Sequence, residues 1–130
     1  MTTHRVSFRR TFLIAPAART ADVAQAIGSI RQITVRQPGR PAAAVTPLFT
    51  DQARGLRVVA RLPDGAGLRL VGVRGPATLA VLLGHLMAAG ESHLLIDPDP
   101  PAHPGLLVTI RSVLRAIRRR RKDRPPRPGP

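Results

Sequence analysis

Short hydrophobic segments recur along the chain in the two patterns that β-strands show. Some are continuous apolar runs, as in a buried strand. Others alternate apolar with polar residues, as in a strand with one face in water. The six segments of this kind are 8–15, 32–36, 45–50, 68–73, 92–97 and 106–108. Prolines follow the first and the fifth, where the missing backbone donor ends a sheet ladder. The pattern predicts six short strands.

Two longer segments carry the signals of α-helices. One opens at Pro76, a residue preferred at the first helical position, is filled by Ala and Leu, and is closed by Gly90. The other is capped by Thr109. It then places apolar residues at i, i+3, i+4 and i+7, so that they form one stripe on a helix. These residues are Ile110, Val113, Leu114 and Ile117. We predict helices over 76–89 and from residue 110 onward.

Capping residues predict two shorter helices. Thr20 is a candidate cap for a helix over 21–27 that Gly28 would stop. Thr50-Asp51 offers an N-cap for one or two helical turns that end at Gly55.

Turn residues divide the remaining segments. Pro-Gly and a further proline predict a turn over 37–41, and Pro-Asp-Gly-Ala-Gly predicts a second over 63–67. The stretch 56–62 fits either the end of a helix or a strand. As a strand, it would form a hairpin with 68–73 across the second turn.

These elements predict a small single domain of the α+β class, with two to four helices on a mixed or antiparallel sheet. A chain of 130 residues supports one core, since it buries roughly two-thirds of its unfolded surface. We expect the domain to cover 1–117 and a basic, disordered tail rich in Arg and Pro to cover 118–130. Only three residues are aromatic, so Leu, Val, Ile and Ala must fill the core.

Composition excludes several classes of protein. The chain has no Cys, which rules out disulfides, thiolate zinc sites and cysteine nucleophiles. The longest uncharged apolar stretch, 76–90, is shorter than the ~20 residues of a membrane-spanning helix. The first twenty residues are basic and superficially like an organelle transit peptide, but the apolar run within them fits a strand better. We expect a cytoplasmic bacterial protein.

Positive charge is concentrated at the C-terminal end. The last twenty residues contribute +8 of the net charge of +14, with eight Arg and one Lys against one Asp. GC-rich coding can explain why Arg replaces Lys throughout, but it explains less well why acids are scarce at one end. Such a cluster attracts nucleic-acid phosphates or anionic lipid head groups. The candidate polyanion-binding residues are Arg111, Arg115, Arg118, Arg119, Arg120, Arg121, Lys122 and Arg124.

No pattern of catalytic or metal-binding residues is complete in this chain. The four histidines are too scattered for a metal motif, and no serine lies in a Gly-x-Ser-x-Gly setting. Gly65 and Gly67 complete no phosphate-binding motif and fit a hairpin turn. Asp97 and Asp99 could bind a cation or exchange protons, although aspartate before proline is ordinary turn chemistry. We expect no enzyme activity, no metal and no cofactor.

Two segments resemble a known bacterial family. The sequence TPLFTD at 46–51 and the sequence LLIDPDP at 94–100 are similar to conserved segments of SseB-like (enhanced serine sensitivity) domains, with Asp97 where that family usually has Asn. The predicted helices over 76–89 and 109–117 fall where the family has them. The resemblance covers about 30–117. It implies an α+β domain without an established catalytic activity, and it transfers no functional residues.

Three functions are compatible with these features. The first is an SseB-like interaction domain whose basic tail binds a polyanion, either nucleic acid or an anionic membrane surface. The second is a protein–protein adaptor or homodimer that uses an open sheet edge or the last helix, with the tail only a solubility element. The third is a small-molecule role in a cleft that the sequence does not reveal.

Overall fold

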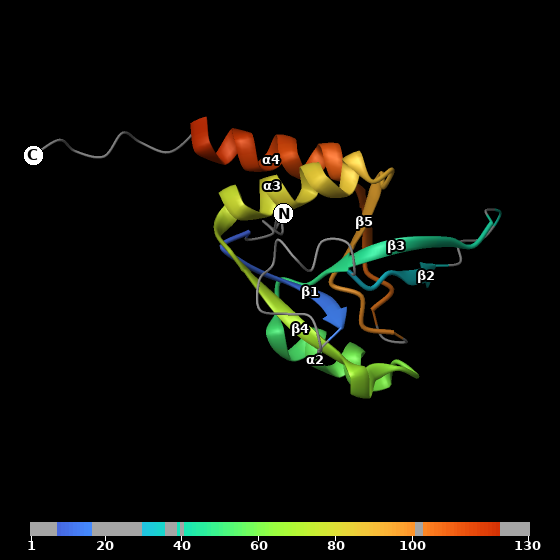
Figure 1. The fold of residues 1–130 in the computed structure, drawn as a ribbon. Coiled ribbons are helices and arrows are strands. Elements are labelled where there is room, and N and C mark those ends of the chain that lie inside the picture. Colours follow the sequence, from blue (N-terminus) through green and yellow to red (C-terminus); the bar gives the residue numbers. More distant parts are fainter. Residues whose placement is uncertain (1–7, 17–29, 36–38, 40, 101–102, 123–130) are drawn as a thin grey trace, which may run out of the picture.

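Two β-sheets and three α-helices make up the described part of the chain (Figure 1). The structure is a computed structural model, and it describes residues 8–16, 30–35, 39, 41–100 and 103–122. The predicted α+β class is confirmed. The helix predicted over 21–27 lies outside the described residues, as does most of the turn at 37–41.

The smaller sheet pairs two strands that are far apart in the sequence. Strand β1 (Arg10–Pro16) runs antiparallel to β4 (Leu68–Arg74). Phe12 and Phe49 exchange two backbone hydrogen bonds of 2.8 and 3.0 Å, and this bridge joins β1 to the residue that follows β3. The hairpin considered for 56–62 and 68–73 is wrong, because the partner of β4 is β1.

The larger sheet is mixed and has the order β2-β3-β5-β6. Its strands are β2 (Ile33–Val35), β3 (Ala43–Leu48), β5 (His93–Ile96) and β6 (Leu106–Thr109). The central pair β3–β5 is parallel and the two outer pairs are antiparallel. All six predicted strands are confirmed, with ends shifted by a few residues.

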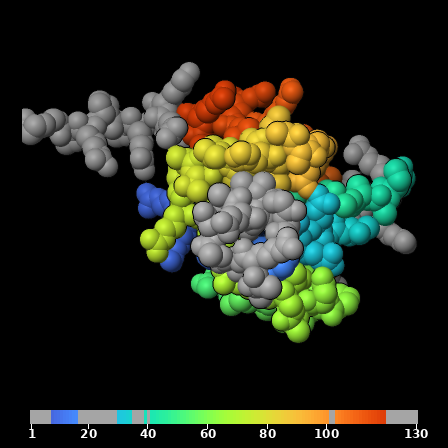
Figure 2. All heavy atoms as spheres, viewed as in Figure 1, coloured from blue at the N-terminus to red at the C-terminus, as the bar shows by residue number. Residues whose placement is uncertain are grey.

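Helices α3 (Gly75–Ala88) and α2 (Gln52–Arg61) cover opposite faces of the β1–β4 sheet, and α4 (Ile110–Lys122) packs beside α3 and β6 (Figure 1). Helices α3 and α4 lie side by side at one surface of the molecule (Figures 1 and 2). Helix α4 continues five residues beyond the domain boundary expected at Ile117. The first five residues assigned to the tail are therefore helical.

Helix α2 is longer than predicted, and the end expected at Gly55 is wrong. Gly55 lies inside the helix, where a β-carbon would come within 2.8 Å of the Leu70 side chain and 3.2 Å of the Phe49 ring. Its role is therefore to let α2 approach β4 closely. Val58 and Val59 are buried one turn further on, which gives the second half of the helix an apolar face to pack.

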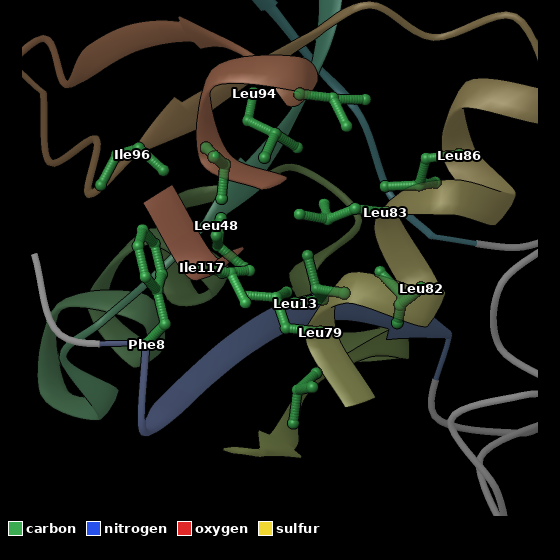
Figure 3. Close-up of a cluster of buried hydrophobic side chains, with 13 residues drawn as sticks. Phe8, Leu13, Leu48, Leu79, Leu82, Leu83, Leu86, Leu94, Ile96 and Ile117 are labelled. Atoms are coloured by element: carbon green, nitrogen blue, oxygen red, sulfur yellow. The ribbon is translucent and has the colours of Figure 1, made fainter. Parts of the chain in front are cut away.

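Consecutive residues of β1 belong to two separate hydrophobic cores. Leu13 belongs to the main cluster beneath α3 and α4, drawn in Figure 3, while Ile14 faces the smaller cluster around Phe49 and α2. Both side chains are almost fully buried. A strand exposes successive side chains on opposite faces, so a sheet covered on both sides is apolar at consecutive positions. This explains the continuous apolar run at the start of the chain.

The turn after α2 is a single 3-10 turn, η3 (Gly65–Gly67), rather than the hairpin turn predicted there. It reverses the chain from α2 into β4. The Gly65 N–H donates to the Leu62 carbonyl oxygen at 3.0 Å, and Gly65 packs directly on the end of α2.

Candidate polyanion-binding site

Helix α4 is held on the domain by the apolar stripe that the sequence predicted. Ile110, Val113 and Ile117 are buried in the main cluster, and Leu114 is partly buried against it. The Thr109 hydroxyl accepts the Ser112 N–H at 3.1 Å, which confirms the predicted N-cap. These contacts determine which side of the helix faces solvent.

Four candidate cations lie on the exposed side of α4. Arg111, Arg115, Arg118 and Arg119 are exposed. The first three are spaced i, i+4 and i+7, which places them in one row with axial steps of about 6 and 4.5 Å. Of the other candidates, Arg120, Arg121 and Lys122 belong to the last turn of the helix, and Arg124 lies outside the described residues.

The described carboxylates are all engaged elsewhere in the molecule. They are Asp51, Asp64, Glu91, Asp97 and Asp99. Asp51 caps α2, Asp64 pairs with Arg31, and the other three bind threonine hydroxyls or arginines of α2. Within the described ranges, no carboxylate forms an ion pair with an arginine of α4. The row on α4 therefore faces solvent with its positive charge uncompensated by these groups.

The helix dipole accounts for only part of this arrangement. Cations are favoured near the C-terminal end of a helix, where Arg118 and Arg119 lie. Arg111 lies in the first turn of α4, where the dipole disfavours a cation and where no acidic residue is present. Like charges at i and i+4, such as Arg111 and Arg115, also repel by a few tenths of a kcal/mol. Local helix stability therefore does not explain the row.

A second arginine cluster, which sequence reasoning missed, surrounds Asp99. The Asp99 carboxylate accepts hydrogen bonds of 3.1 Å from Arg57 and from Arg61, and Arg54 Nε lies 3.9 Å away. The three arginines are spaced i, i+3 and i+7 on α2. In a helix over 52–61 this spacing places them on one face, so the sequence could have indicated that they lie together. Their partner was not predictable, since Asp99 lies about forty residues further along the chain.

The arginine cluster lowers the pKa of Asp99 below its ordinary value of 3.8. The hydrogen bond from Arg57 is the largest cause. Desolvation of the carboxylate opposes it, and the charges of Arg57, Arg61 and Arg54 lower the pKa further. A carboxylate whose pKa is depressed by folding stabilises the protein above its unfolded pKa, and that stabilisation is lost as the pH falls through the folded pKa.

We therefore expect Asp99→Asn to lower the melting temperature at pH 7, and the difference from the unmodified protein to shrink as the pH is reduced below about 4. Thermal unfolding followed by circular dichroism at pH 7 and near pH 3 measures both values. Asp64→Asn is the control, because its pair with Arg31 is largely solvent-exposed and contributes little. A difference that stays constant with pH would contradict the assignment.

Asp97, the other aspartate of this turn, ties two strand ends together. Its N–H donates to the Leu48 carbonyl oxygen at 2.9 Å, and its carboxylate accepts the Thr50 N–H at 2.7 Å and the Thr50 hydroxyl hydrogen. Its φ of 50° is a left-handed conformation that aspartate tolerates better than most residues. The sequence reading of 97–100 as turn chemistry agrees with these internal contacts.

The remaining candidates from the sequence do not gather into one site. His85 lies on α3, His93 opens β5 with its Nδ1 2.7 Å from the Ser92 hydroxyl, and His103 exchanges backbone hydrogen bonds with Asp99. His4 lies outside the described residues. None of the helices in the described ranges is both long and apolar enough to cross a membrane.

Comparison with known proteins adds no family assignment. A scan against protein-family models and a search of curated proteins both return no match. The geometry of α4 and the patterns in the sequence therefore carry the functional argument.

Proposed function

We propose that this protein is a non-catalytic, cytoplasmic SseB-like interaction domain that binds polyanions through the exposed arginine row of α4. The phosphate backbone of nucleic acid is its preferred partner, bound without sequence specificity. The observation that carries this proposal is the row of Arg111, Arg115 and Arg118, exposed on a well-anchored helix and unpaired with any described carboxylate. Guanidinium groups bind phosphate oxygens in a bidentate manner, which suits such a row.

The packing of α4 favours nucleic acid over a membrane. A helix that inserts into a lipid surface needs a free apolar face. The apolar face of α4 is already buried in the main cluster, so only its cations remain for a partner. The chain has no Trp or Tyr, the side chains that most often stack on bases, and this favours contacts with the nucleic-acid backbone.

The order of the elements supports the proposed SseB-like family. Strand β3 and the cap of α2 carry the TPLFTD segment, and β5 with its following turn carries LLIDPDP. Strand β4 and helix α3 lie between them, and α4 follows. This is the sequence of elements that the resemblance implies.

The proposal is tested by titrating the full chain, and a chain that ends at Ile117, against a duplex DNA of mixed sequence at several salt concentrations. We expect the full chain to bind with a steep salt dependence, each neutralised phosphate contributing about −0.9 to the log–log slope. The shortened chain should bind more weakly and with a flatter slope. Equal binding by the two chains would contradict the proposal, and tighter binding to phosphatidylserine vesicles than to DNA would assign the site to membranes.

One observation favours the adaptor alternative. An apolar hollow of about 240 Å³ lies between β6 and α4, and Leu106 at its margin is 58% exposed. Strand β6 is also the last strand of its sheet among the described residues. If light scattering shows a dimer that persists at high salt, and DNA binding is absent, this face and not the arginine row is the functional surface.

A further inference from the structure

A cavity of about 350 Å³ lies where α3 ends beside the β2–β3 and β5–β6 pairs. In Figure 1 this end of α3 lies away from the C-terminal end of α4. The volume of the cavity is within the range of small-molecule pockets. Its lining includes the apolar residues Ala43, Ala44, Val45 and Leu107 and the polar residues Gln32, Glu91, Ser92 and His93. It therefore combines the two surfaces that a small organic ligand needs.

The described residues that line this cavity carry a negative charge, opposite in sign to the net charge of the protein. Lys and Arg account for 21 of the 130 residues, yet none of those in the described ranges lines the cavity. Of the described carboxylates, only Glu91 lines it. Among the described residues, no Arg, Lys or His lies within ion-pair distance of Glu91, whereas Asp64 and Asp99 are both paired with arginine. A positively charged ligand group would therefore complement the Glu91 carboxylate.

The backbone holds Glu91 in place at the end of α3. Gly90, with φ 96°, and the bonds from Gly90 N to Met87 O and from Glu91 N to Leu86 O form a Schellman motif. The position after the glycine of this motif is commonly hydrophobic and packs back on the helix. Here it is a glutamate that binds Thr46 on β3 instead of the helix.

The Thr46 hydroxyl orients the Glu91 carboxylate but occupies only part of its hydrogen-bond acceptor capacity. The hydroxyl of Thr46, which is fully buried, lies 3.1 and 3.0 Å from its two oxygens. A hydroxyl has one hydrogen to donate, while an ionised carboxylate offers about four acceptor positions. Most of the acceptor capacity of Glu91 therefore remains for a ligand in the cavity.

We propose that this cavity binds a small organic cation, whose ammonium or guanidinium group donates to Glu91 and whose aliphatic part lies against Ala44, Val45 and Leu107. Gln32 also lines the cavity, and its amide would hydrogen-bond a second polar group of such a ligand. The site is independent of the arginine row on α4. A net charge of +14 disfavours non-specific binding of cations to the protein surface.

The test uses agmatine, which carries a guanidinium and an amine on an aliphatic chain, with the full-length protein. Millimolar agmatine should shift the backbone amide resonances of residues 43–45 and 89–93. Neutral n-butylurea should not. Glu91→Gln keeps the shape and the acceptor for Thr46 but removes the charge, and it should weaken agmatine binding by about tenfold or more.

Two further variants make the result decisive. Asp51→Asn removes an exposed carboxylate outside the cavity and retains a good N-cap, so agmatine binding should be unchanged. Ala44→Leu narrows the cavity from an exposed strand position while Glu91 stays intact, and it should also block binding. Unshifted amides at 43–45 and 89–93, equal affinity for n-butylurea, or full binding by Glu91→Gln or Ala44→Leu would each overturn the proposal.

Discussion

Replacing Arg111, Arg115 and Arg118 together by glutamine is expected to lower the affinity of the protein for duplex DNA by on the order of 100-fold at about 0.1 M salt. Each lost phosphate contact removes about 0.9 from the log–log salt slope, so three lost contacts flatten it by about 2.7. Glutamine is a good helix former, and the three side chains are exposed, so α4 itself should remain folded. Fluorescence anisotropy of labelled DNA across a salt series measures both quantities.

The control removes positive charge at another place on the surface. Arg10 and Arg74 are exposed and lie directly opposite each other at the end of the β1–β4 pair. Changing both to glutamine relieves a like-charge contact and should not destabilise the sheet. We expect each charge removed in this variant to change the log–log salt slope less than each charge removed from α4. An equal change would mean that the net charge of the whole protein, and not the row on α4, attracts DNA.

The parts of this fold that were predictable from the sequence depend on local signals. The apolar stripe of α4, its threonine cap and the arginines beyond it all lie within fourteen residues, so one helical period reveals them. Helix α3 is similar, with Pro76 near its start and Gly90 just past its end. These signals act between neighbours in the chain, where spacing alone decides which residues share a face.

Long-range pairing could not be predicted in the same way. Nothing in 10–16 indicates that its partner is 68–74, and the separation into two sheets follows from that pairing. Gly55 is an example. A glycine can end a helix, or it can lie within a helix and allow another side chain to pack closely, and the sequence does not distinguish these two roles. Only the position of Leu70 on β4 distinguishes the two roles. The same holds for Asp99, whose three arginines are identifiable only after α2 is docked.

The few carboxylates of the chain connect the fold to the proposed function. Those at 97 and 99 stabilise the junction of β3, β5 and α2, and Asp64 pairs with an exposed arginine. Each such contact uses a carboxylate that is then not available to pair with the arginines of α4. Folding therefore separates the charges of the described residues, with paired arginines around α2 and unpaired ones on α4. This separation would persist in any variant that preserves the core.

Gly65→Ala is expected to destabilise the protein by about 1–3 kcal/mol, because overpacking a well-packed site has a cost of this size. A β-carbon at Gly65 would lie 2.1 Å from the Val59 carbonyl oxygen. That oxygen is a backbone atom, and it accepts the Leu62 N–H at 3.2 Å at the end of α2. It cannot rotate away as a side chain would, so the turn must separate from the helix or the helix must lose its last hydrogen bond.

Gly67→Ala, two residues further along the same turn, is the matched control. A β-carbon there has no atom within 4 Å, and the backbone does not have a positive φ. The substitution should be neutral or stabilise the protein by up to about 1 kcal/mol, since it restricts the unfolded chain. Urea unfolding of both variants measures the difference. If Gly65→Ala and Gly67→Ala change the free energy of unfolding equally, the tight contact between η3 and α2 does not determine how the chain turns from α2 into β4.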